Sequence, residues 1–225
     1  MKRYTVVNNF INILHGNDVL IFSGEELCKE VYGNNKPNYF YIKDSIGVAV
    51  PFGLGIAMCT DKRVFVFIGE GELMRELGII SQIGASKCSN MFLVLLDNGC
   101  YQSAGGYPTV FENMLSKKGF IYNSNTKVIT FTKHFNDKEF KKLKERFLRL
   151  VGPMVILMDV DKGIKKGLEE IDVDFEEQRD RISKFILDST KETAMFVPPI
   201  LSMSDIDIKT LNVDALKSEV MTNGL

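Results

Sequence analysis

Short runs of apolar residues alternate with longer segments of mixed polarity along most of this chain. Six of these runs have the length of single strands, at residues 19–22, 39–42, 64–68, 91–96, 127–131 and 154–160. Several are apolar at consecutive positions, which is typical of strands buried on both faces. The pattern therefore predicts a parallel sheet that is covered by helices.

The segments between the runs carry helical patterns. Helices are predicted near residues 6–14, 25–32, 47–59, 73–84, 140–150 and 175–187, and the fourth is expected to be one long helix under the sheet. Alternating strands and helices predict an α/β fold, namely a doubly wound, mostly parallel six-stranded sheet with helices on both faces. The composition changes near residue 197, so we expect one domain over residues 1–190 and an arm or tail over residues 191–225.

Composition and charge exclude several classes of protein. The 28 basic and 29 acidic side chains leave a net charge of -1, whereas a protein that coats nucleic acid carries a strong positive excess. No apolar stretch approaches the roughly 20 residues that span a bilayer, and the start of the chain lacks the apolar core of a secretory signal. The four cysteines form no CxxC pair, so we expect buried or free thiols. We also expect the chain to be cytoplasmic.

A glycine-rich turn follows the apolar run at residues 64–68. Gly69, Glu70 and Gly71 come directly after this run, and a helical pattern begins at once. Parallel sheets bind ligands at the carboxyl ends of their strands, where glycines permit close approach and first-turn helix amides can hold a phosphate. Because Glu70 would repel that phosphate, a cation is expected between them, and Mg²⁺ commonly bridges carboxylate and phosphate oxygens.

A second pair of polar residues ends the next apolar run. Asp97 and Asn98 follow residues 91–96, and Asn98 lies 28 positions after Glu70, which leaves room for one helix and one strand. Neighbouring strands could therefore bring Glu70 and Asn98 to one cation at the same edge of the sheet. On spacing alone, an ordinary pair of turns between strands and helices remains the alternative interpretation.

These residues resemble the GDG…N motif of thiamine diphosphate enzymes. The similarity covers roughly residues 18–163 and is with the diphosphate-binding domain of the phosphonopyruvate and sulfopyruvate decarboxylases. It includes the SAGGYPT stretch at residues 103–109, which follows the Asp97-Asn98 pair as in that family. The resemblance implies that thiamine diphosphate and Mg²⁺ are the cofactors.

The resemblance also implies a role for each residue of the motif. Glu70 and Asn98 would bind the metal through their side chains, and Cys100 would bind it through its main-chain carbonyl. Gly71 and Glu72 would present amides to the diphosphate. The cofactor-binding residues implied at this edge are Gly69, Glu70, Gly71, Glu72, Asn98, Cys100 and Tyr101.

Residues 44–47 resemble the segment of the family that holds the aminopyrimidine ring of the cofactor. Ile46 would be the bulky residue that forces the cofactor into its bent V shape, and it is the catalytic position expected from this chain. The Asp44 carbonyl would accept a hydrogen bond from the pyrimidine amino group, while Ser45 and Gly47 complete the turn.

The sequence departs from the family pattern at three positions. Glu70 stands where the family has Asp, and its extra methylene moves the carboxylate outward at a metal that tolerates little distortion. Asp44 stands where the family tends to have Gly, so a carboxylate there could repel acidic substrates. Val48 stands where the family often has His, so one polar substrate contact is expected to be missing.

One part of the family's machinery has no counterpart in this chain. The glutamate that activates the pyrimidine belongs to a separate pyrimidine-binding domain, and the similarity to the diphosphate domain already uses most of the residues. The resemblance therefore implies a partner subunit that supplies this glutamate. We also expect an apolar interface around residues 46–50 and 101–107, and hence a homo- or hetero-oligomer.

The implied activity is that of the cofactor-binding subunit of a two-component decarboxylase. Its substrate would be a small 2-oxoacid, and its products carbon dioxide and an aldehyde, with no nucleic-acid or membrane partner. Two alternatives stay open. One is a subunit of a carboligase similar to acetolactate synthase, and the other is a degenerate, non-catalytic partner domain, which Glu70 and Asp44 favour.

Overall fold

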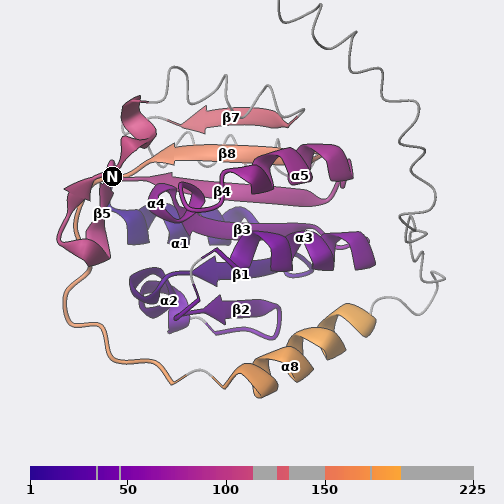
Figure 1. Cartoon of the computed structure of the whole chain (residues 1–225). Helices are drawn as coiled ribbons and strands as arrows, with labels where there is room; N and C mark the ends of the chain where they lie inside the picture. Colours follow the sequence, from indigo (N-terminus) through magenta and orange to yellow (C-terminus); the bar gives the residue numbers. More distant parts are fainter. Residues whose placement is uncertain (34, 46, 114–125, 132–149, 173, 189–225) are drawn as a thin grey trace, which may run out of the picture. The chain divides into compact units, whose positions relative to one another are not determined.

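The central feature of the chain is a sheet of six parallel strands in the order β2-β1-β3-β4-β8-β7 (Figure 1). The structure is a computed structural model, and it describes residues 1–33, 35–45, 47–113, 126–131, 150–172 and 174–188. The strands are β1 (Val19–Ser23), β2 (Tyr39–Ile42), β3 (Val64–Gly69), β4 (Met91–Asp97), β7 (Lys127–Phe131) and β8 (Met154–Asp159). All six predicted strands are confirmed, with small shifts at their ends.

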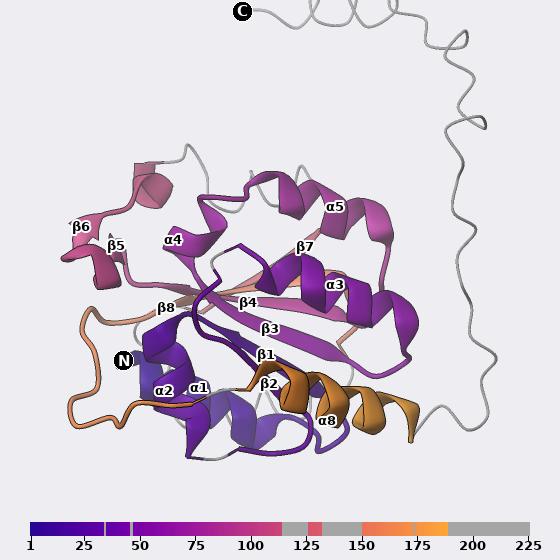
Figure 2. The same cartoon turned by 60° about the horizontal axis from the view of Figure 1, so that its bottom comes forward.

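Helices cover both faces of the sheet (Figure 2). On one face α1 (Arg3–Ile13) and α2 (Glu25–Tyr32) share an apolar core with the strands, and on the other face α3 (Ala49–Cys59) and α5 (Gly78–Ser86) do so. A further helix, α8 (Phe175–Leu187), runs beside β2. The predicted α/β fold is therefore confirmed.

Aromatic side chains fill the core between α1 and the sheet. The Phe10 ring meets Phe67 edge-on at a centroid distance of 5.6 Å, and Phe22 stacks on Phe67 at 5.0 Å. Full burial of such a side chain contributes roughly 2 kcal/mol. On the opposite face Gly53 lets α3 approach closely, because a Cβ there would collide with Val66.

The prediction of one long helix after β3 is wrong. The chain instead forms a short α4 (Glu70–Leu73), a turn, and then α5. Around the turn Arg75 N bonds Glu72 O, and Glu76 N bonds Leu73 O, so the spacing is three residues in place of the four of an α-helix. Gly78 follows this turn, and glycine in a helix interior costs about 1 kcal/mol relative to alanine, so a continuous helix is disfavoured there.

Small elements connect these layers at the carboxyl ends of the strands. After β4 the chain forms a short antiparallel hairpin of β5 (Cys100–Tyr101) and β6 (Tyr107–Pro108), with η1 (Gln102–Ala104) between them and η2 (Val110–Asn113) after them. In the described part of the chain no helix is long and apolar enough to cross a membrane.

Three predictions fall partly or wholly outside the described residues. They concern Ile46, most of the helix near residues 140–150, and the arm or tail over residues 191–225. The boundary near residue 190 therefore stays a prediction. The helix expected over residues 175–187 is confirmed as α8.

Side chains of α8 bind the backbone of the edge strand β2. Tyr41 N donates to Gln178 Oε1 at 2.7 Å, and Gln178 Nε2 donates to Tyr41 O at 3.2 Å. Arg181 donates from a terminal nitrogen to Tyr39 O at 2.9 Å. The helix therefore satisfies backbone groups that an edge strand would otherwise leave open.

Candidate functional site

A cavity of about 150 Å³ opens at the carboxyl edge of the sheet, where the strand arrowheads point in Figure 1. Residues from the ends of β1, β3 and β4 line it together with parts of α1, α2, α4 and η1. The predicted site residues among those that line it are Gly69, Glu70, Gly71, Glu72, Asn98, Cys100 and Tyr101. The parallel register explains this gathering, because Gly69 on β3 lies opposite Leu96 on β4.

Glu70 is the most buried ionisable side chain of this cavity wall, at 1% exposure. Its carboxylate accepts a bond from Asn98 N at Oε2 (3.3 Å) and one from Thr109 Oγ1 at Oε1 (3.4 Å). The longer side chain is therefore folded against the loop that follows β4. Burial raises the pKa of Glu70, and the Asp97 carboxylate raises it further, while backbone amides that include those of Asn98 and Cys100 oppose the shift.

Asn98 and Cys100 lie in a tight turn directly after β4. Asn98 Oδ1 accepts a hydrogen bond from Cys100 N at 2.9 Å, and Asp97 Oδ1 accepts one from Gly99 N at 3.0 Å. Gly99 has φ +71°, which glycine adopts without strain. Since an amide oxygen has two lone pairs, Asn98 Oδ1 retains one for a further ligand.

Gly71 lies where the helix α4 and the hairpin meet. A Cβ at this position would come within 2.7 Å of the Tyr101 ring, so only glycine permits the contact. Its amide and that of Glu72 belong to the first turn of α4, where helix geometry leaves amides without an intrahelical partner. These two amides are therefore suited to an anion in the cavity.

The turn at residues 44–47 is placed differently from the motif residues. Asp44 and Ser45 are exposed and are not among the described residues that line the cavity. The Asp44 side chain lies 3.9 Å from the Lys43 ammonium and is 78% exposed. Gly47 is buried and has φ +87°, and Ile46 lies outside the described residues.

Glu72 has a side-chain role that the sequence did not reveal. Its Oε1 accepts hydrogen bonds from Ser23 Oγ and from Gly47 N. Burial raises the pKa of Glu72, and these two donors oppose the shift. Both donors lie far away in the sequence, so no local motif pointed to them.

Two arginines also line the cavity, and sequence reasoning missed both. Arg3 forms a two-bond ion pair with the buried Glu30, from Nε to Oε2 at 2.9 Å and from a terminal nitrogen to Oε1 at 3.0 Å. Arg75, just after α4, is exposed at the cavity mouth. These two positive charges lie in the same wall as the carboxylates of Glu26, Glu70 and Glu72, and nothing in the local sequence around Arg3 signalled its position.

The donor set fits a hard divalent cation beside a diphosphate. It combines one carboxylate, one side-chain amide oxygen and one main-chain carbonyl, which are oxygen ligands that Mg²⁺ prefers. In the described part of the chain no group of three His, Cys, Asp or Glu side chains could hold a metal. The raised pKa of Glu70 reflects a buried carboxylate that a cation would stabilise.

Solved structures share the fold of this chain. Benzoylformate decarboxylase from Polynucleobacter necessarius superposes with a TM-score of 0.60 at 16% identity, over 73% of this chain and 34% of that one. A putative thiamin diphosphate-dependent enzyme from Mycobacterium smegmatis superposes with a TM-score of 0.58 at 18% identity, over 72% of this chain and 32% of that one. The chain thus spans about a third of the length of these larger enzymes.

Curated relatives are similar at the level of sequence. The sulfopyruvate decarboxylase subunit beta of Methanothermobacter thermautotrophicus is 29% identical over 193 residues, which cover 85% of this chain and 99% of the relative. The phosphonopyruvate decarboxylase of Streptomyces viridochromogenes is 34% identical over 83 residues, or 36% of this chain and 21% of the relative. The family model of the thiamine pyrophosphate enzyme C-terminal TPP binding domain matches residues 27–157, more than half of the chain. The chain therefore belongs to the family of thiamine pyrophosphate enzyme C-terminal TPP binding domains.

Proposed function

We propose that this chain is the subunit of a two-component 2-oxoacid decarboxylase that binds thiamine diphosphate and Mg²⁺ in the cytoplasm. The observation that carries the proposal is the meeting of Glu70, at the end of β3, with Asn98, at the end of β4, in one cavity. The beta subunit of sulfopyruvate decarboxylase, which aligns over almost its whole length, supports a division into two chains.

The residues of the sheet edge would anchor the cofactor. Glu70 and Asn98 would bind the metal with their side chains and Cys100 with its carbonyl, while the amides of Gly71 and Glu72 would bind the diphosphate. Bound thiamine diphosphate supplies the electron sink for loss of carbon dioxide from a 2-oxoacid. Arg3 would add positive charge to the same cavity, where Glu30 limits its movement.

The turn at residues 44–47 would orient the pyrimidine end of the cofactor. Ile46 would support the bent shape, and the Asp44 carbonyl would accept from the amino group. The activating glutamate would come from an alpha subunit that also forms the other wall of the substrate site. The exposed Val48 and Tyr107, at 48% and 72% exposure, support an interface near this end of the sheet.

Calorimetry and an activity assay test the proposal together. We expect the purified chain to bind thiamine diphosphate only with Mg²⁺, and to release carbon dioxide from sulfopyruvate, phosphonopyruvate or another small 2-oxoacid only after the alpha subunit is added. Full activity of the isolated chain would overturn the proposal that the enzyme needs two subunits. Failure to bind the cofactor with the partner present would favour a non-catalytic domain, and a hydroxyketone product would favour a carboligase.

A further inference from the structure

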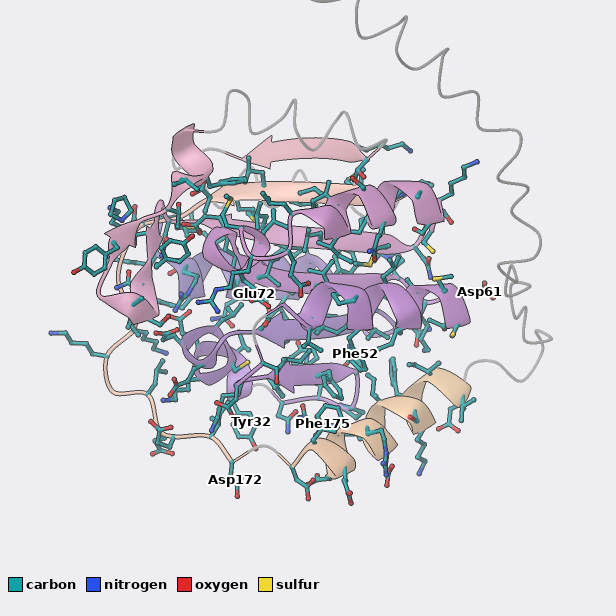
Figure 3. The ribbon with its side chains drawn as sticks, in the orientation of Figure 1. Tyr32, Phe52, Asp61, Glu72, Asp172 and Phe175 are labelled. Carbon is teal, nitrogen blue, oxygen red and sulfur yellow. The ribbon has the colours of Figure 1, made fainter. Side chains whose placement is uncertain are left out.

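One carboxylate oxygen joins three separate segments at the carboxyl edge of the sheet. Glu72 Oε1 accepts a hydrogen bond from Ser23 Oγ at 2.7 Å, at the end of β1, and one from Gly47 N at 3.1 Å, in the turn before α3. Figure 3 shows Glu72 between α4 and the start of α3. The side chain therefore links the diphosphate end of the cavity to the turn at residues 44–47.

The conformation of Gly47 matches this link. Its φ of +87° is strained for any residue with a side chain, and a Cβ there would lie 2.5 Å from the Glu76 carboxylate. Glu76 thus packs over Gly47 while Glu72 accepts its N–H, so two side chains from one stretch of chain hold the same glycine. The position of the turn is consequently set from the α4 side.

The other described residues of the turn, Asp44 and Ser45, lie at the surface. Next to Asp44, Lys43 Nζ donates to Ile171 O at 3.4 Å. A hydrogen bond to a charged acceptor is stronger than one between neutral groups. Loss of the Glu72 acceptor would therefore remove the hydrogen bond at Gly47, at the carboxyl-terminal end of the turn, while the contact of Lys43 with Ile171 next to the amino-terminal end would remain.

We propose that Glu72 is a positioning residue, which fixes the turn at residues 44–47 and thereby the place of the pyrimidine ring relative to the diphosphate. The part of this statement that concerns the cofactor rests on the proposed function. The part that concerns the turn is a property of the chain alone. Glu72 is distinct from the metal ligands because its Oε1 is directed to Ser23 and Gly47.

Amide hydrogen exchange in the chain without cofactor directly tests the hydrogen bond from Gly47 N to Glu72. We expect Glu72→Ala to reduce protection of the Gly47 amide about tenfold, the effect of losing one hydrogen bond. Glu72→Gln keeps an acceptor oxygen at the same length and should retain most of the protection. Ser23→Ala removes the other donor only, so it serves as the matched control and should change Gly47 protection less than about threefold.

Protection of the Val64 amide, which bonds Asn90 O inside the sheet, reports whether each variant is folded. Should Glu72→Ala unfold, Glu72→Asp provides the same test with a side chain that is too short to reach Gly47. Unchanged Gly47 protection in a folded Ala or Asp variant would overturn the proposal.

Calorimetry with two ligands separates this inference from the proposed function. Glu72→Ala keeps the main-chain amide that is proposed to bind the diphosphate. With Mg²⁺ present, it should therefore bind inorganic pyrophosphate within about threefold of wild type, yet bind thiamine diphosphate about tenfold more weakly, and Glu72→Gln should recover most of that loss. Equal loss for both ligands would mean that Glu72 acts on the anion site and would overturn the positioning role. Wild-type protein that binds neither ligand would overturn the proposed function. The exchange experiment would still show whether Glu72 holds the turn at Gly47.

Discussion

Two regions at the same edge of the sheet differ in how firmly the chain holds them. The first comprises residues 69–72 and 97–101, which we propose to hold the metal and name the metal edge, and the second is the turn at residues 44–47. At the metal edge Glu70 is 1% exposed and accepts hydrogen bonds from Asn98, after β4, and from Thr109, after β6. In the turn the Asp44 side chain is 78% exposed, and Glu72 provides the link at Gly47.

The contrast shows which half of a cofactor site one chain can build alone. The metal edge lies at the ends of the neighbouring strands β3 and β4, so the sheet itself fixes its geometry. The turn precedes α3, and its exposed side is formed by Asp44 and Ser45 together with the adjacent Val48, which is 48% exposed. A second surface packed against that side would complete the turn, in agreement with the proposed partner subunit.

The largest expected effect comes from breaking the metal edge. Asn98→Ala removes a proposed metal ligand, so affinity for thiamine diphosphate with Mg²⁺ should fall about a hundredfold in calorimetry. Asn90→Ala is the matched control at the opposite end of β4, where the Asn90 side chain donates to the carbonyls of Thr60 and Lys62. That variant should lower stability but leave the cofactor affinity of the folded protein unchanged. The metal assignment fails if Asn98→Ala binds as tightly as wild type.

The second effect concerns the turn and separates turnover of the enzyme from its affinity for the cofactor. Ile46→Ala should reduce turnover of the two-subunit enzyme about tenfold or more, with little change in cofactor affinity, because bending serves orientation within the cofactor. The comparison requires the cofactor to be saturating in both proteins. Wild-type turnover in the variant would remove this role from Ile46.

The third effect is a stability change at Glu70. Its pKa lies above the usual 4.5, so its contribution to stability is fully present below the unfolded pKa and is lost as pH rises through the folded pKa. Glu70→Gln should therefore stabilise the cofactor-free chain at neutral pH by on the order of 1 kcal/mol and remove this part of the pH dependence. Urea unfolding at several pH values measures both.

The same variant should also respond differently to metal. Mg²⁺ should raise the melting temperature of wild type in the presence of thiamine diphosphate but not that of Glu70→Gln, since a neutral amide is a weaker ligand. In wild type the metal effect should weaken as pH falls, because protonation of Glu70 competes with the cation. An undiminished metal effect in Glu70→Gln would contradict the assignment.

The smallest expected effect lies on the exposed side of the turn and hairpin. Tyr107 is 72% exposed, so Tyr107→Ser should change the stability of the isolated chain by less than about 0.5 kcal/mol. It should nevertheless weaken association with the alpha subunit severalfold in analytical ultracentrifugation. Lys87→Ser, at the exposed carboxyl-terminal end of α5, provides a surface control, and equal association of both variants would place the interface elsewhere.

Much of this arrangement could be predicted because it depends on local pattern. The strands β3 and β4 are continuous apolar runs. Glu70 directly follows β3 and Asn98 directly follows β4, so the parallel pairing of these strands brings the two residues together. The helix α2 was predicted with the correct limits because turns flank its amphipathic pattern on both sides.

The remainder depends on contacts between distant segments. Glu72 meets Ser23 and Gly47 across 49 and 25 residues, and the hydrogen bond depends on side-chain direction, which periodicity does not encode. Arg3 enters the cavity because Glu30 on the neighbouring helix holds it there. The sequence did not predict the turn between α4 and α5, because the helical spacing of apolar residues continues through it although the helix itself is interrupted there.

The helix α8 has a consequence for how this chain can assemble. Its Gln178 and Arg181 occupy backbone groups of Tyr39 and Tyr41 that another strand would otherwise pair with. Growth of the sheet across β2 into a second chain, the route of strand addition and of many aggregates, is therefore blocked while α8 stays in place. Displacement of this single helix would expose a template for intermolecular β-sheet, so mutations that loosen α8 should appear first as loss of solubility.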